Sequence, residues 1–250
     1  MLKMKIIGKR KILLCLFCFL TVASAVAQVG DRRSEIAFGF NAGVALNKIT
    51  FEPTIKQSYH VGPTMGMTFR YTCEKYFKTV CALQVELNYT RLGWTEDIVN
   101  FDNEPLPETY TRNQNYIELP LLARLGWGRE VKGFMGYFFA GPQIGWCINE
   151  TEKRNQWTLN AEGHPSRPNN MYAQYDMPIE NKFDYGITAG LGCELHTKIG
   201  HFMIDGRYYF ALSDIYGNSK RDVFERSANG TILVKFTYLF NLRADKTPRR

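Results

Sequence analysis

The chain has 250 residues, and its 31 lysine and arginine residues against 24 aspartate and glutamate residues give a formal charge of +7. Five of the positive charges lie within the first eleven residues, so 26 remain against 24 acids in residues 28–250, a balance of about +2. A nucleic-acid-binding protein needs a clustered basic face. Residues 28–250 have one basic cluster, which we expect to be a solvated tail: Arg243, Lys246, Arg249 and Arg250.

The N-terminus has the three parts of a secretory signal. A basic start from Lys3 to Lys11 precedes an apolar run from Ile12 to Leu20, and Ala25 and Ala27 form a small-x-small cleavage site. A retained membrane anchor is the alternative, but the apolar run is shorter than the ~20 residues that a spanning helix needs. We therefore expect residues 1–27 to be a signal peptide that is removed on export.

The rest of the chain alternates apolar and polar residues, which is typical of β-strands and not of helices. The clearest example is Leu83–Thr90, where Leu83, Val85, Leu87 and Tyr89 share one face. The alternation predicts eight strands, at about 36–48, 60–72, 81–95, 115–127, 134–146, 184–196, 201–213 and 229–242.

Strand number, strand length and loop length together favour a membrane barrel. The number is even, and each segment exceeds the ~9–11 residues that a tilted strand needs to cross a bilayer. The predicted links alternate between short ones, such as Thr197–Gly200, and long ones, of which Cys147–Phe183 is the longest. The prediction is an all-β fold: an eight-stranded antiparallel up-and-down transmembrane β-barrel over residues 28–242, followed by a short periplasmic tail, 243–250.

A soluble, lipocalin-like barrel is the alternative for eight strands behind a secretion signal. It would turn the apolar face inward around a cavity and leave the polar face in water. The opposite face, however, carries many charges on neighbouring strands, and these can pair with one another only when they share a lumen. We therefore expect the apolar face to contact lipid, and the decisive residues are Leu83, Val85 and Leu87 on one face against Glu86 and Arg207 on the other.

Four blocks in the middle of the chain carry a family resemblance: Ala82–Gly93, Tyr116–Arg124, Tyr137–Gly145 and Asp184–Leu195. In this order they resemble the PorT-like, or "porin family", outer-membrane barrels of the Bacteroidetes. The resemblance implies an OmpA/OmpX-like barrel in the outer membrane, without a defined activity. The namesake member belongs to the type IX secretion and gliding machinery, and this chain has no motif that ties it to that role.

Eight charged residues are predicted to face the lumen. An eight-stranded barrel is just wide enough for its own side chains, so a paired plug is expected rather than a conducting pore. In such a plug, loss of Arg207 or Glu118 would leave a partner charge uncompensated. The predicted ionic network comprises Arg70, Glu86, Glu118, Arg124, Glu194, Asp205, Arg207 and Lys235.

Cysteine and histidine give little evidence for chemistry. Cys73 and Cys81 flank the first short link and can form a disulfide in an oxidising compartment or remain free thiols, depending on hairpin register. The four histidines fall on different loops and strand ends. Ser58, His60 and an outer-rim Asp214 are the nearest approach to a catalytic set, and nothing in the sequence orders them. We expect no catalysis, cofactor or metal.

The long loops are the expected seat of function, because binding residues concentrate on loops held by a rigid scaffold. The longest loop contains the candidate recognition residues Trp157, Tyr172 and Tyr175. The predicted function is a structural or surface-recognition role in the outer membrane, in contact with lipid and lipopolysaccharide. The alternatives are an assembly component of a type IX secretion or gliding apparatus, with other envelope proteins as partners, and a lipid A-modifying enzyme.

Overall fold

The computed structural model describes residues 31–243, except 101, 130, 131, 162, 166, 168–171, 220 and 221. The expected signal peptide and most of the basic tail lie outside the described residues. No helix in the described part of the chain is long and apolar enough to cross a membrane.

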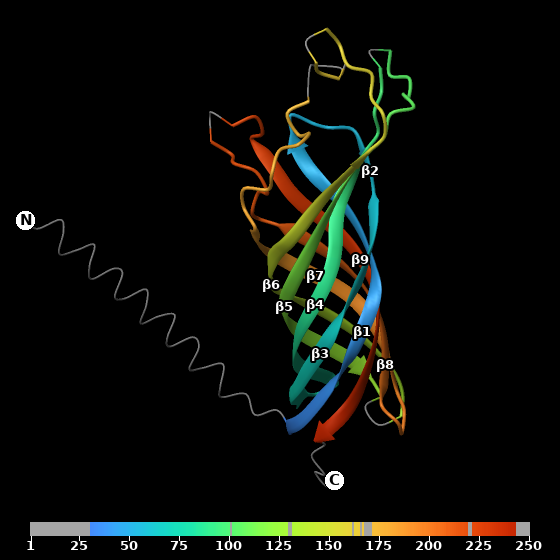
Figure 1. Ribbon diagram of the computed structural model, residues 1–250. Coiled ribbons are helices and arrows are strands. Elements are labelled where there is room, and N and C mark those ends of the chain that lie inside the picture. Colours follow the sequence, from blue (N-terminus) through green and yellow to red (C-terminus); the bar gives the residue numbers. More distant parts are fainter. Residues whose placement is uncertain are drawn as a thin grey trace, which may run out of the picture.

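The described residues form eight long strands and one short one (Figure 1). Each long strand contains one of the segments predicted from the alternation, apart from the last two residues of the segment at 201–213. The strands are β1 (Asp31–Glu52), β2 (Gln57–Ser58), β3 (His60–Tyr76), β4 (Thr79–Glu96), β5 (Tyr110–Gly128), β6 (Gly133–Arg154), β7 (Phe183–His196), β8 (His201–Ala211) and β9 (Arg226–Arg243).

The long strands close into one antiparallel barrel. The order around the ring is β1, β3, β4, β5, β6, β7, β8 and β9, with β9 pairing back to β1 and β4 pairing with β5. Each strand therefore lies beside its neighbours in sequence, which is the up-and-down arrangement, and no long strand keeps a free edge. The two-residue β2 was not predicted; it pairs with Thr95 and Glu96 at the end of β4.

The barrel has two different ends (Figure 1). At the turn end, β3 joins β4 through residues 77–78, β5 joins β6 through 129–132, and β7 joins β8 through 197–200. The start of β1 and the end of β9 lie at this end as well, since Ile36 pairs with Arg243. The long connections all lie at the opposite, loop end. They are shorter than predicted, because β6 continues to Arg154 and β5 begins already at Tyr110.

The apolar face of the wall points outward. Leu83 and Leu87 are 54% and 51% exposed, whereas Glu86 is 1% exposed. Aromatic side chains near strand ends also point outward, including Trp127 and Trp146. The structure thus excludes the soluble alternative, in which Leu83 and Leu87 would line an inner cavity while Glu86 and Arg207 met water.

An apolar core that was not predicted from the sequence lies inside the barrel at its loop end. Phe51, Trp94 and Phe224 are buried there, with ring centroids 5.3 Å apart for Phe51–Trp94 and 5.1 Å apart for Phe51–Phe224. Tyr110 and Tyr216 belong to the same cluster. The lumen is therefore polar in its middle and apolar beneath the loops. The apolar part forms because inward-facing residues near the loop ends of the strands pack against apolar residues of the loops.

Candidate functional site

The eight residues of the predicted lumen network are all buried inside the barrel, none of them more than 4% exposed. Seven of them form two ion-pair clusters. The period-2 alternation places them on one face of their strands, and ring closure then brings together residues that are more than 100 positions apart in the chain.

The first cluster surrounds Glu86 in the middle of the barrel. Arg207 donates from Nη1 to Glu86 Oε2 (3.0 Å) and from Nη2 to Glu86 Oε1 (3.1 Å). Lys235 Nζ donates to the same carboxylate at 2.8 Å, and Arg207 Nε donates to Asp205 at 2.8 Å. Gln84 is a further donor to Glu86. Each buried charge in this cluster therefore has an opposite charge within hydrogen-bonding distance, as burial requires.

The second cluster surrounds Glu194 nearer the turn end. Arg70 Nη1 lies 2.8 Å from Glu194 Oε1 and 2.9 Å from Oε2, and Arg124 pairs with Oε2. The Arg124 guanidinium also lies over the Tyr137 ring, 3.8 Å from its centroid. The paired side chains of the two clusters occupy the middle and the turn-end part of the lumen.

Glu118 differs from the other seven residues. Its carboxylate accepts a hydrogen bond from the Thr90 hydroxyl at 2.6 Å, and the structure gives it no ion pair among the described residues. The prediction that Glu118 pairs with an opposite charge in the lumen is therefore wrong. The reason is its position along the barrel axis: Glu118 lies closer to the loop end than Glu86, beside the Thr64 and Thr90 hydroxyls.

Several buried charges were missed from the sequence. Arg112 donates to Glu152 at 2.5 Å and also pairs with Glu150, and its side chain is 2% exposed. Asp184 accepts hydrogen bonds from Ser213 and from Asn229. The available signal was the alternation itself, because Arg112 lies on the same face of β5 as Glu118, six residues earlier.

Charged contacts tie the longest loop, residues 155–182, to its neighbour, residues 97–109. Arg167 in the longer loop pairs with Glu108 in the shorter one. The Tyr175 hydroxyl accepts a hydrogen bond from Arg167 Nε (2.9 Å) and donates one to Glu96 (2.8 Å). Burial, with the Glu96 carboxylate adding to it, raises the pKa of Tyr175 well above its usual range. This contact therefore uses a neutral hydroxyl.

The three loop aromatics singled out in the sequence come together at one pocket of about 570 Å³. The ring centroids of Trp157 and Tyr175 are 4.6 Å apart, and Tyr172 stacks on His164 at 4.4 Å. Polar groups also line the pocket, among them Asn155 and the exposed ion pair between Arg154 and Asp176. We call this the loop pocket. It combines flat aromatic faces with both hydrogen-bond donors and acceptors.

The disulfide considered for Cys73 and Cys81 is absent, and both residues are free thiols. A bulge between Thr72 and Glu74 takes Cys73 out of register, so that Cys81 pairs with Glu74.

The candidate catalytic residues have other partners, since Ser58 donates to Asp97 and Asp214 accepts from Asn218. Two histidines expected on separate strand ends, His196 and His201, lie together at the turn end.

Similar solved structures are OprG from Pseudomonas aeruginosa (12% identity, 84% of this chain and 98% of that chain, TM-score 0.46) and the attachment invasion locus protein Ail of Yersinia pestis (12%, 84% and 99%, 0.38). Neisserial surface protein A is a third (12%, 82% and 99%, 0.38). A search of curated proteins gives no match.

The family profile for the outer membrane protein beta-barrel domain matches residues 26–217. This match covers more than half of the 250 residues, and the chain therefore belongs to the outer membrane protein beta-barrel domain family, as a barrel of the cell outer membrane.

Proposed function

We propose that the chain is a closed barrel that recognises saccharides at the cell surface through the loop pocket. In outer-membrane barrels the short turns face the periplasm and the long loops face the exterior, so the loop pocket would open outside the cell. The observation that carries the proposal is the meeting of Trp157, Tyr172 and Tyr175 at one pocket with an exposed Arg154–Asp176 pair at its side.

The chemistry of the pocket favours a sugar over an apolar ligand. A pyranose ring presents C–H groups on its faces, which pack on aromatic rings, and hydroxyls on its edge, which need both donors and acceptors. Asn155, Arg154 and Asp176 supply these groups beside the aromatic faces. The rigid support is also present, because Arg167 and Glu108 hold the loop that carries the pocket.

The test is binding of the detergent-solubilised protein to purified surface polysaccharides and to an array of oligosaccharides. We expect Tyr172→Ala to weaken binding at least tenfold, because Tyr172 lines the pocket and is only partly buried. The matched control is Tyr185→Ala, which removes an aromatic ring from the outer wall at the loop end. Equal binding by both variants, or no saccharide binding by the wild-type protein, would contradict the proposal.

The resemblance to the PorT-like group of the Bacteroidetes adds a second, narrower proposal, that the barrel serves a secretion or gliding apparatus with other envelope proteins as partners. It rests on the blocks quoted from the sequence, of which Tyr116–Arg124 lies wholly within β5. Deletion of the gene would then abolish export of surface proteins. A deletion strain that still exports its surface proteins but no longer binds the saccharide would favour surface recognition over a role in secretion.

A further inference from the structure

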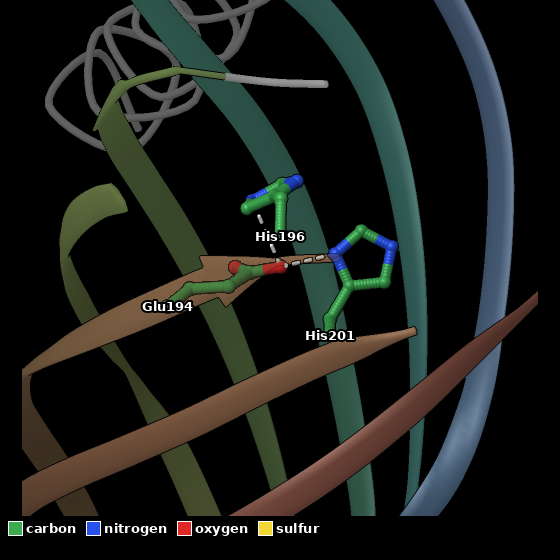
Figure 2. Close-up of side chains that lie close together, drawn as sticks. All are labelled: Glu194, His196 and His201. Carbon is green, nitrogen blue, oxygen red and sulfur yellow. Dashed lines mark ion pairs between the residues drawn. The ribbon is translucent and has the colours of Figure 1, made fainter. Parts of the chain in front are cut away.

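A cluster of potential metal ligands lies at the turn end of the lumen, away from the loop pocket. The four-residue link 197–200 folds β8 back on β7, so that His196 pairs with His201 in register. Glu194 lies two residues before His196 and shares its inward face. Figure 2 shows both imidazole rings turned toward the Glu194 carboxylate. One ligand atom from each residue lies within 4.8 Å of the other two, and all three side chains are buried.

We propose that Glu194, His196 and His201 bind one divalent transition-metal ion that prefers imidazole ligands, such as Zn²⁺ or Cu²⁺. Glu194 Oε1 lies 3.1 Å from His196 Nε2 and 2.8 Å from His201 Nδ1. Ligand atoms bound about 2.0–2.2 Å from one ion are about 2.8–3.1 Å apart when the angle at the ion is about 90°, and about 3.3–3.6 Å apart when it is tetrahedral. The two separations therefore match adjacent ligands of one ion at angles of about 90°.

The hydrogen bonding around His201 supports this assignment. His201 Nε2 lies 3.0 Å from the Asn241 amide oxygen, so this nitrogen can donate its proton to Asn241 and leave Nδ1 as the metal ligand. Nδ1 faces a carboxylate oxygen at 2.8 Å, and this position suits a metal ion or a proton that both atoms share. A histidine that ligates a metal usually donates its other ring N–H to an outer group, which is the role that Asn241 fills.

His196 gives a second, independent indication. Its Nδ1 has no hydrogen-bond partner among the described residues, and its Nε2 lies 3.1 Å from Glu194 Oε1 without the geometry of a hydrogen bond, although the side chain is only 8% exposed. A buried ring nitrogen without a partner loses the hydrogen bond that it makes in water, and an uncompensated loss of this kind is uncommon in folded proteins. Coordination of an ion through Nε2 would remove the deficit for the nitrogen that faces Glu194.

Arg70 and Arg124 determine which ions fit. They bind the same carboxylate, which fixes its orientation, but their positive charges oppose a further cation. Only an ion with a strong preference for nitrogen ligands gains enough from two imidazoles to offset this repulsion. Ca²⁺ and Mg²⁺ prefer oxygen ligands, and we expect neither to bind. Cu²⁺ should bind more tightly than Zn²⁺.

The experiment uses the processed chain in detergent micelles without a polyhistidine tag. Competition for Zn²⁺ with a chromophoric chelator should give one ion per chain, unaffected by millimolar Ca²⁺ or Mg²⁺. His196→Ala and His201→Ala should each weaken Zn²⁺ binding at least tenfold. His60→Ala and His164→Ala remove the other two histidines of the chain and should leave the affinity unchanged.

A spectroscopic measurement on the wild-type protein keeps the proposal testable if a histidine variant fails to fold. The electron paramagnetic resonance spectrum of the Cu²⁺-loaded chain should show hyperfine coupling to two imidazole nitrogens. Absence of Zn²⁺ and Cu²⁺ binding, or binding that survives in a folded His196→Ala/His201→Ala variant, would overturn the proposal. Saccharide binding does not depend on this cluster, so the two proposals can fail separately.

Discussion

Arg207 on β8 forms two hydrogen bonds with Glu86 on β4, across the full width of the barrel. β4 and β8 are four places apart in the ring of eight long strands and so belong to opposite walls. Arg70 on β3 and Glu194 on β7 are related in the same way at the turn end. These cross-lumen pairs bridge strands that share no backbone hydrogen bonds, and they fix the shape of the barrel from inside.

Loss of the Arg207 guanidinium should destabilise the barrel strongly. In Arg207→Ala, Asp205 loses its ionic partner and Glu86 keeps only Lys235 as an ionic partner. Removal of one member of a buried pair costs about 3–5 kcal/mol. The measurement is urea-induced unfolding of the barrel in detergent or lipid, followed by tryptophan fluorescence.

The matched control is Arg154→Ala, which breaks the exposed pair with Asp176 at the loop end. An exposed pair contributes about 0–1 kcal/mol, so the control should unfold at nearly the urea concentration of the wild type. Similar losses in the two variants would show that the cross-lumen pair has no special structural role.

Glu118 provides the converse prediction. Since the Glu118 carboxylate accepts its hydrogen bond from the Thr90 hydroxyl, Glu118→Gln keeps an acceptor oxygen for that bond and breaks no ion pair among the described residues. We expect a change in the free energy of unfolding below about 1 kcal/mol. Glu86→Gln should cost several times more, because Lys235 then loses its counter-charge and Arg207 keeps only Asp205. Equal losses for Glu118→Gln and Glu86→Gln would contradict this distinction.

The difference between Glu86 and Glu118 also marks the limit of sequence reasoning. The alternation of β4 and β5 was enough to place both carboxylates in the lumen, because side-chain direction has a period of two residues. It does not show which residues of opposite walls lie at the same level along the barrel axis. That level depends on strand tilt and on the register of every strand pair around the ring. The inward face was therefore predictable, and the partner of each charge was not.

The same limit applies at both ends of the barrel. Trp157 and Tyr175 are recognisable as loop aromatics, but their contact depends on Arg167 reaching Glu108 in another loop. The His196–His201 pair had a usable signal: a four-residue link between two strands that had already been predicted. Reading that link as a hairpin would have placed both histidines beside Glu194, since residues at positions i and i+2 of a strand share a face.

The outer wall makes a prediction about lipid contact. Leu87 lies at the middle of β4, points outward and pairs with the equally exposed Met67 of β3. Leu87→Arg places a charge on the lipid face, which costs about 2–4 kcal/mol near the bilayer midplane. The readout is the unfolding free energy in lipid vesicles.

Phe77→Arg serves as the control for that substitution, because Phe77 is exposed in the turn between β3 and β4. At the membrane surface an arginine costs about 0–1 kcal/mol. A loss for Leu87→Arg no greater than that for Phe77→Arg would mean that the middle of β4 does not face hydrocarbon.

Tyr175 predicts how the loops respond to pH. Its hydroxyl is held between Arg167 and Glu96, and burial raises the pKa of Tyr175 above its usual value. A pKa raised by folding means that the stabilisation is complete below the unfolded value of about 10 and is lost as the pH rises through the folded pKa. Resistance of residues 155–182 to proteolysis should therefore stay constant between about pH 6 and 9 and decrease above about pH 10.

Tyr175→Phe tests the same contact without a change of pH. The variant keeps the ring packed on Trp157 but removes the hydroxyl that links Arg167 to Glu96, and a hydrogen bond to a charged group contributes about 1.5–3 kcal/mol. Cleavage within residues 155–182 should become faster at every pH, and the decrease in protection above pH 10 should disappear. Tyr185→Phe, on the outer wall, should behave as the wild type does. If protection of the wild-type protein already decreases as the pH is raised from about 6 to 9, an acid–base group other than Tyr175 controls the loops.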